Sequence, residues 1–277
     1  MTASPAPAEL QAPLKYLAAA GETPVFYASQ GGGDETRYLG DYEERTVVLR
    51  DGRAETARGG AFDLDREGFV LLHHDSAVAD FYDDDEIARV YTPEVAALVE
   101  AATGAARVLV FDYTRRSDSP ATQAARGIRD PASIVHNDYT ARSAPRRLRD
   151  LLPAAEAERL LERRFAVVNV WRPIRGPVTT TPLALCDAAS VAPGDLVASE
   201  RRAKARTGEI QQALYSPAHR WFWFPGMRPD EVVLIKTYDS ATDGRARFTL
   251  HAAFRNPAAA PDAVPRESIE ARCFAFF

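Results

Sequence analysis

Short runs of hydrophobic residues, separated by polar and turn-forming residues, recur along the chain and are clearest in its second half. Such runs, rich in Val, Ile, Phe and Tyr and bounded by Pro, Gly or Asp, are typical of β-strands. They lie at 22–29, 45–53, 106–114, 165–174, 231–240, 245–254 and 267–277. The pattern predicts a mainly β protein with flanking helices, built as a β-barrel or cupin-like jelly roll.

Two segments instead repeat their hydrophobic residues every three or four positions, which predicts amphipathic helices at 83–105 and 153–165. The first segment opens with acidic residues, which a helix N-terminus favours, and Gly104 is a typical stop signal.

The ends of the chain differ in composition. Residues 1–13 are rich in Ala and Pro, and we predict a flexible tail there. The remainder, 14–277, is predicted to be a single domain. Its N-terminal strands and helix are expected within 14–105 and the β-rich core within 106–277.

Charge and composition exclude several classes of protein. Of the 277 residues 46% are hydrophobic, and 34 Lys and Arg against 39 Asp and Glu give a formal net charge of −5. The basic residues are scattered, so no nucleic-acid partner is expected. No apolar run reaches the roughly 20 residues of a membrane span, and the N-terminus lacks a secretory signal. We therefore predict a cytoplasmic protein without a membrane partner, either a monomer or a homodimer.

A short polar segment, "VHNDYT", contains residue types that bind metal ions. Residues two apart on a strand share a face, so His136 and Asp138 are able to hold one metal ion together. His73 and His74 are adjacent and would point to opposite faces. His219 lies in a Pro-rich aromatic loop, where a substrate contact is the better hypothesis. An ordinary strand end with a hydrogen-bonded His and Asp is the alternative for the "HND" sequence itself.

His251 is the best third ligand. In "RARFTLHAAF" it shares a polar face with Arg247 and Thr249, while Phe248, Leu250 and Ala252 form the apolar face. Two imidazoles and one carboxylate form the facial set that suits non-haem Fe(II) used with O₂.

The last predicted strand carries a second pattern. Its alternate residues Arg266, Ser268, Glu270 and Arg272 share one face. A guanidinium group is suited to bind a carboxylate through two hydrogen bonds, so this face is a candidate site for a dicarboxylic acid. The alternative is a charged strand at the edge of a sheet.

The chain resembles the hydroxylase/desaturase family of Fe(II)/2-oxoglutarate-dependent oxygenases, which includes gibberellin-desaturase-like enzymes and proteins related to the cephalosporin methoxylase component. The matching stretches follow in order and cover nearly everything after residue 60. They are "GFVLLHHDSAVADFYDD", "TGAARVLVFDYTRR", "VHNDYT", "VVNVWRPI", "PLALCDA", "WFWFPGMRPDEVVLIKTYDS", "LHAAFRNP" and "PRESIEARC". "LHAAF" departs from the usual wording of the family but keeps the histidine.

The resemblance implies a double-stranded β-helix and the cofactors Fe(II), 2-oxoglutarate and O₂. By this resemblance His136, Asp138 and His251 are the iron ligands. Arg266 with Ser268 matches the place of the 2-oxoglutarate site, and Arg272 and Arg172 compete for that role. The implied activity is hydroxylation or desaturation of a small molecule, in specialised metabolism.

Several residues are predicted to contact the substrate. Aromatic walls and polar contacts are expected from Tyr139, Trp171, Trp223 and His219. The segment 115–133 is long for a connection in a compact domain and is a candidate lid. Its arginines, Arg116, Arg126 and Arg129, indicate an anionic or carboxylate-bearing substrate, and a solvated loop is the alternative, which is slightly favoured.

Three alternatives stay open from the sequence. The chain is also compatible with an iron oxidase that closes rings without 2-oxoglutarate, or with a jelly-roll hydrolase or isomerase that binds zinc or manganese. The third alternative is a jelly-roll binding protein without catalytic activity.

Overall fold

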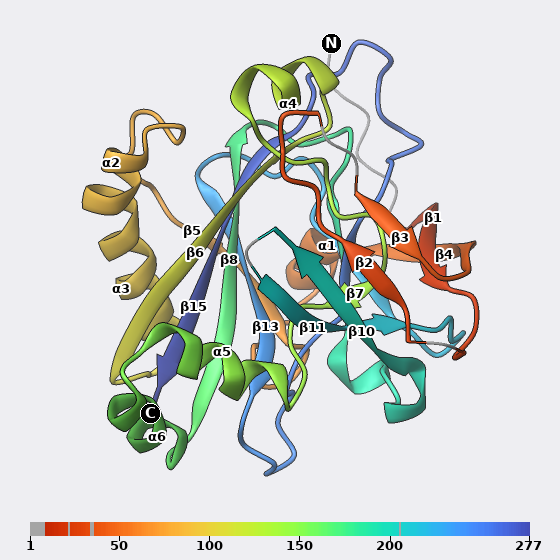
Figure 1. Cartoon of the computed structure of the whole chain (residues 1–277). Coiled ribbons are helices and arrows are strands. Elements are labelled where there is room, and N and C mark those ends of the chain that lie inside the picture. The colour runs from red at the N-terminus through yellow and green to blue at the C-terminus, as the bar shows by residue number, and fades with distance from the viewer. Residues whose placement is uncertain (1–8, 22, 34–35, 205) are drawn as a thin grey trace.

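The protein folds into two β-sheets that face each other, with most helices on the outside (Figure 1). The computed structural model describes residues 9–21, 23–33, 36–204 and 206–277. The two layers form the double-stranded β-helix that the sequence predicts, and the side chains between them define the interior.

The smaller sheet has five antiparallel strands and forms one wall of the interior. Their order is β5 (Phe69–His73), β13 (Glu231–Asp239), β8 (Phe165–Arg175), β15 (Glu267–Phe276) and β6 (Arg107–Ser117). The central strands β8, β13 and β15 are buried on both faces, which explains their nearly continuous apolar sequences. β15 is therefore an internal strand and not a charged edge.

The larger sheet has ten strands and supplies the opposite wall. Their order is β1 (Glu9–Leu17), β4 (Tyr42–Asp51), β12 (Trp221–Trp223), β9 (Leu183–Cys186), β14 (His251–Ala253), β7 (His136–Asn137), β11 (Arg206–Ala213), β10 (Leu196–Ala203), β2 (Val25–Tyr27) and β3 (Arg37–Leu39). Very short strands lie at its centre, where β14 and β7 each contribute two or three residues.

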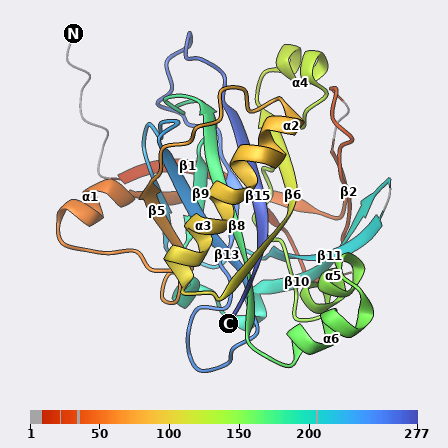
Figure 2. The same cartoon turned by 90° about the vertical axis from the view of Figure 1, so that its left-hand side faces the viewer.

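Two connected helices cover the outer face of the smaller sheet (Figure 2). α2 (Asp84–Glu86) continues through a π-helical turn at Ile87–Tyr91 into α3 (Thr92–Thr103). Val95 and Val99 of α3 are fully buried against the sheet. Gly104, with a left-handed φ of 71°, ends the helix, as predicted.

The remaining helices are short and lie around the ends of the sheets. They are α1 (Gly52–Ala57), α4 (Pro120–Arg126), α5 (Ser143–Leu151), α6 (Ala154–Leu161) and the 3₁₀ turns at Ala188–Ser190 and Pro193–Asp195. α6 falls within the predicted helix at 153–165, whereas α5 was not predicted. Both cysteines are free and buried, as expected.

Three predictions about the chain organisation are wrong. Residues 9–13, assigned to a flexible tail, form half of β1 and pair with β4; the rest of that tail lies outside the described residues. The strands of 14–105 belong to the same sheets as the rest of the chain and not only to an N-terminal extension, since β5 pairs with β13 and β4 pairs with β12. Within the predicted strand at 245–254, only His251–Ala253 form a strand, β14.

Among the helices that the structure describes, none is both long and apolar enough to span a membrane.

Candidate metal centre

Strand pairing brings two histidines together on the inner face of the larger sheet. His251 of β14 is paired directly with His136 of β7, and directly paired residues of antiparallel strands point to the same side. The same cross-strand row continues through Gln212 of β11 on one side and Leu185 of β9 on the other. The two imidazole rings have their centroids 4.5 Å apart.

Asp138 completes a cluster of three potential ligands. One ligand atom from each of His136, Asp138 and His251 lies within 4.8 Å of the others. Asp138 Oδ1 is 3.5 Å from His136 Nε2. His136 Nδ1 lies 2.7 Å from the Ile134 carbonyl, to which it can only donate a hydrogen bond, so that Nε2 carries the free lone pair.

The protonation states suit a metal site. Burial lowers the pKa of His251 to about 3, with a further contribution from His136, so the imidazole is neutral. Burial by itself would raise the pKa of Asp138, but the Arg272 guanidinium holds it well below its ordinary value. His251 Nδ1 is buried and has no hydrogen-bond partner among the described residues. Two imidazoles and a carboxylate are the donor set that fits Fe(II).

Two residues of the smaller sheet hold the other oxygen of the Asp138 carboxylate. Oδ2 accepts hydrogen bonds from Asn169 Nδ2 of β8 at 2.8 Å and from Arg272 Nε of β15 at 2.9 Å. Asn169 and Arg272 are directly paired across these strands. They fix the carboxylate so that Oδ1 faces the histidines, which is how partners of a metal ligand usually act.

Arg272 is fully committed to carboxylates of the protein. Its Nη1 donates to Asp112 at 3.0 Å and to Thr114 at 2.9 Å, and its Nη2 donates to Glu270 at 2.6 Å. With Nε on Asp138, each of the three guanidinium nitrogens already donates to a group of the protein. Arg272 and Arg266, the two arginines of this strand face that were predicted as alternatives, thus differ in their partners.

Arg266 is placed differently. It is 2% exposed, its Nε donates to Ser268 Oγ at 3.1 Å and its Nη1 to the Thr181 carbonyl at 2.8 Å. The guanidinium lies 5.0 Å from the ring centroid of Trp171. Within the described chain no carboxylate comes within 4.0 Å of it. Burial, with Arg116 adding to it, lowers the pKa of Arg266 to about 9.

Two cavities open on the metal ligands. The larger, about 200 Å³, borders His136, Asp138 and Tyr139. The narrower, about 20 Å³, borders His136, His251 and the residues Trp171, Arg266 and Ser268. Both lie between the two sheets.

Four predicted site residues lie elsewhere. Arg172 follows Trp171 on β8 and therefore points to the outer face, where it donates to Pro229 and His74 carbonyls and stacks near Tyr91. His219 is hydrogen-bonded to Asp195 at 3.1 Å. Trp223 packs against Phe254 in a core on the opposite face of the larger sheet. Arg126 of α4 lies over the Tyr82 ring, at 4.4 Å from its centroid.

The predicted lid at 115–133 is not one long loop. It contains the end of β6, then α4, whose N-cap is Ser119 and whose C-terminal Gly127 has a left-handed φ of 64°. Its final residues return to pair with β6, since Arg129 forms an isolated bridge with Arg116. These two arginines, and not Arg126, line the larger cavity.

Asn169 was not among the predicted site residues. A polar residue within "FAVVNVW" breaks an apolar run, and its spacing from Trp171 places the two side chains on the same inner face. That signal was available in the sequence. Its partner Asp138, by contrast, lies 31 residues earlier on the other sheet, so the contact itself was not predictable.

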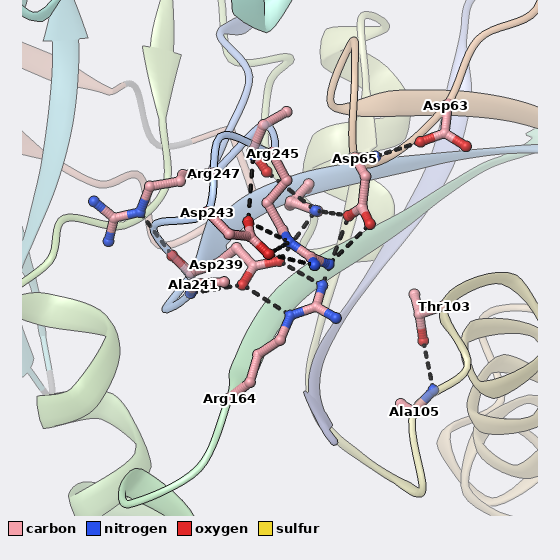
Figure 3. A network of polar contacts seen from close by, with 12 residues as sticks. Asp63, Asp65, Thr103, Ala105, Arg164, Asp239, Ala241, Asp243, Arg245 and Arg247 are labelled. Carbon is pink, nitrogen blue, oxygen red and sulfur yellow. Dashed lines mark hydrogen bonds and ion pairs between the residues drawn. The ribbon is translucent and has the colours of Figure 1, made fainter.

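An ionic network around the buried Lys236 and Asp239 anchors the segment that leads to His251 (Figure 3). Lys236 of β13 donates to Asp239 and to the Ala246 carbonyl, both at 3.1 Å, and to Asp65. Arg164 adds a 2.8 Å bond to the same Asp239. The Thr249 amide then donates to the Lys236 carbonyl at 2.9 Å, two residues before the ligand. The network thus fixes an irregular segment without a sheet partner of its own.

The fold and the site together define a non-haem iron oxygenase built on a double-stranded β-helix. Residues 14–276 match a family described as "Oxidoreductase/YMDC permease-like domain". The chain belongs to the hydroxylase/desaturase family of Fe(II)/2-oxoglutarate-dependent dioxygenases, as the following relatives show.

Among the relatives is the hydroxylase/desaturase CTB9 of Cercospora beticola, 36% identical over 275 residues, covering 89% of this chain and 83% of that protein. The Fe(II)/2-oxoglutarate-dependent dioxygenase nvfI of Aspergillus novofumigatus is 37% identical over 225 residues, covering 78% of each. The solved structure of the iron and alpha-ketoglutarate-dependent endoperoxidase NvfI superposes with a TM-score of 0.84 at 28% identity, covering 97% of this chain and 98% of that one.

Proposed function

We propose that the protein hydroxylates or desaturates a small molecule that bears a carboxylate, in specialised metabolism, using Fe(II), 2-oxoglutarate and O₂. His136, Asp138 and His251 hold the iron, and Arg266 with Ser268 binds the distal carboxylate of 2-oxoglutarate. The iron and the keto acid, when bound, supply the oxidising chemistry. The contribution of the protein is to bind and orient them and to keep Asp138 ionised.

The observation that carries this proposal is the buried, unpaired guanidinium of Arg266. A buried charge is costly unless it is paired, and the described residues supply hydrogen-bond acceptors to Arg266 but no counter-ion. The cavity that it borders also contains His136 and His251. A dicarboxylic acid placed there would reach the metal with one end and neutralise Arg266 with the other.

The narrow cavity has to widen for this binding. Its volume of about 20 Å³ is room for little more than one water molecule. The side chains of Trp171 and Arg266 form one side of it, so these are the groups whose positions we expect to change when the keto acid enters.

An anaerobic titration tests the proposal. Iron-loaded protein is titrated with 2-oxoglutarate while the visible charge-transfer band of a chelated keto acid is followed. Asp138→Ala should form no band. Arg266→Gln should need about tenfold to hundredfold more 2-oxoglutarate, since a hydrogen bond to a charged group contributes about 1.5–3 kcal/mol.

Arg172→Gln is the matched control, because Arg172 is as deeply buried as Arg266 but lies on the outer face of the same sheet. It should need the same 2-oxoglutarate concentration as the unmodified protein. An unchanged requirement in Arg266→Gln would overturn the assignment of this arginine. Iron binding without any band in the unmodified protein would instead favour the iron oxidase that uses no keto acid.

The predicted cytoplasmic location, the single domain and the choice between monomer and homodimer stay predictions from the sequence.

A further inference from the structure

We propose that Arg129 and Arg201 form a subsite for the carboxylate of the substrate, next to an aromatic wall made by Phe26 and Tyr38. The inference rests on the proposed function, in which the narrow cavity takes 2-oxoglutarate and leaves the larger one to the substrate. All four residues line the larger cavity together with His136 and Asp138. The substrate class is therefore an organic carboxylate with a flat, unsaturated part.

Backbone pairing places one of these arginines beside another cation. Arg129 forms a parallel bridge with Arg116, in which the Ser117 amide donates to the Arg129 carbonyl at 3.0 Å. Both side chains border the cavity. Arg116 Nη1 is held by the Asp130 carbonyl at 2.6 Å, which is a neutral acceptor and leaves the charge uncompensated.

Strand pairing also fixes Arg201. It lies on β10 opposite Phe26 of β2, and its guanidinium is 5.7 Å from the centroid of the Phe26 ring. Phe26 in turn stacks on Tyr38 of β3, with 5.3 Å between centroids and an interplanar angle of 12°. The cation and the aromatic wall thus come from neighbouring strands and face the same space.

These arginines have no counter-ion in the described part of the chain. Neither Arg129 nor Arg201 has a carboxylate within 4.0 Å. Burial lowers the pKa of Arg201 to about 10, and the charges of Arg272 and Arg129 add to the effect. Burial also lowers the pKa of Arg129, followed by the charge of Arg116. The guanidinium groups repel one another, and a bound anion would remove that repulsion.

The acidic residues of the cavity are already engaged. Asp138 and Asp112 are bound by Arg272. Glu209 accepts hydrogen bonds from Thr140 and Arg142. Asp112 and Asp138 offset the charges of Arg129 and Arg201 only in part. Six arginines and three carboxylates line the larger cavity, which therefore keeps an excess of positive charge. Such a cavity attracts anions and favours a carboxylate over a neutral group.

Binding of a probe tests the subsite. The probe is 2-naphthoate, with neutral 2-naphthamide as its matched analogue, and calorimetric titration measures both dissociation constants on the full chain, loaded anaerobically with Fe(II) and 2-oxoglutarate. The carboxylate should bind the unmodified protein at least tenfold more tightly than the amide. Arg129→Gln and Arg201→Gln should each weaken 2-naphthoate at least tenfold. Arg201→Lys should retain more affinity than Arg201→Gln, because it keeps the charge.

Arg202→Gln is the control within the same strand. Arg202 is the next residue of β10, is exposed and is paired with Glu200 at 2.7 Å. Its variant should bind 2-naphthoate as the unmodified protein does. Equal affinities for the carboxylate and the amide, or unchanged binding in both Arg129→Gln and Arg201→Gln, would overturn the subsite.

The same proteins show which anion these arginines bind. If Arg129→Gln and Arg201→Gln raise the 2-oxoglutarate requirement of the charge-transfer band and leave 2-naphthoate binding unchanged, the arginines serve the cosubstrate and the proposal is overturned. A failure of the proposed function is visible separately, as the absence of that band from the unmodified protein. The probe titrations are then repeated without 2-oxoglutarate and decide the subsite by the same criteria.

Discussion

Asn169 offers a direct test of how the protein sets the iron site, because it touches Asp138 without carrying a charge. Its side chain is fully buried, and Nδ2 donates to Asp138 Oδ2 at 2.8 Å. In Asn169→Ala the carboxylate keeps its bond from Arg272 but loses the second donor that fixes its rotation. We expect weaker iron binding and retained folding.

The structure gives the magnitude. One hydrogen bond to a carboxylate contributes about 1.5–3 kcal/mol, and each 1.4 kcal/mol is about a tenfold change in an equilibrium constant. If the bond serves to keep Asp138 Oδ1 facing His136, its loss should weaken Fe(II) binding by about tenfold to hundredfold. Removal of partners that orient metal ligands commonly has an effect of this size.

The assay is an anaerobic competition for Fe(II) between the protein and a chromophoric chelator, with urea unfolding measured in parallel. Asn256→Ala is the control, since Asn256 is a buried asparagine whose Nδ2 donates to the Thr179 carbonyl at 2.8 Å, outside the metal centre. It should lose stability but keep its iron affinity. Unchanged iron affinity in Asn169→Ala, or an equal loss in both variants, would refute the orienting role of Asn169.

Three further predictions concern charged residues. Arg272→Gln should destabilise the metal-free protein by about 3–5 kcal/mol, the usual effect of breaking a buried ion pair, and Fe(II) should raise its melting temperature less than that of the unmodified protein, because Asp138 loses a donor that orients it toward the histidines. A larger rise would contradict this. Burial raises the pKa of Asp239, but hydrogen bonds from Arg164 and other donors outweigh it and hold the pKa below 3.8. The stability that Asp239 contributes is therefore present above pH 3.8 and is lost as the pH falls further, so urea unfolding should show a deficit in Asp239→Asn that shrinks below that pH; a constant deficit would contradict the linkage. Arg266→Met should unfold at higher urea than the unmodified protein when both are free of ligand, because it removes an unpaired buried charge; a lower midpoint would show that the guanidinium is satisfied by the protein itself.

The period of two along a strand predicted which residues lie together, although the strands are shorter than predicted. His136 and Asp138 do lie together, as do Arg266 and Ser268, but Asp138 follows the end of β7 and Arg266 precedes the start of β15. The same rule places Arg172 on the outer face, because it is adjacent to the inward-pointing Trp171. Arg172 was nevertheless predicted as a 2-oxoglutarate ligand because it lies in a motif of the family. Adjacent positions on one strand do not share a cavity.

Other parts of the site were beyond the sequence because they depend on contacts between distant segments. His219 is held by Asp195, 24 residues earlier, and it lines neither of the two cavities that border the metal ligands. Arg201 faces the cavity because β10 pairs with β2 in parallel, a pairing that joins residues about 175 positions apart. Sequence periodicity predicts a face of a strand, and only the sheet order decides what that face meets.

The interior arginines divide by whether the protein itself neutralises them. Arg272 has three carboxylate partners, and such a residue contributes to the structure of the unliganded protein. Arg266, Arg129 and Arg201 are placed inside with no counter-ion among the described residues, which costs folding free energy. Selection retains an unfavourable buried charge where a ligand supplies the missing partner, so stability is exchanged for binding at these positions. Arg266 borders the narrow cavity, whereas Arg129 and Arg201 border the larger one. Because His136 lines both cavities, 2-oxoglutarate and the substrate carboxylate are expected in different cavities that meet at this metal ligand.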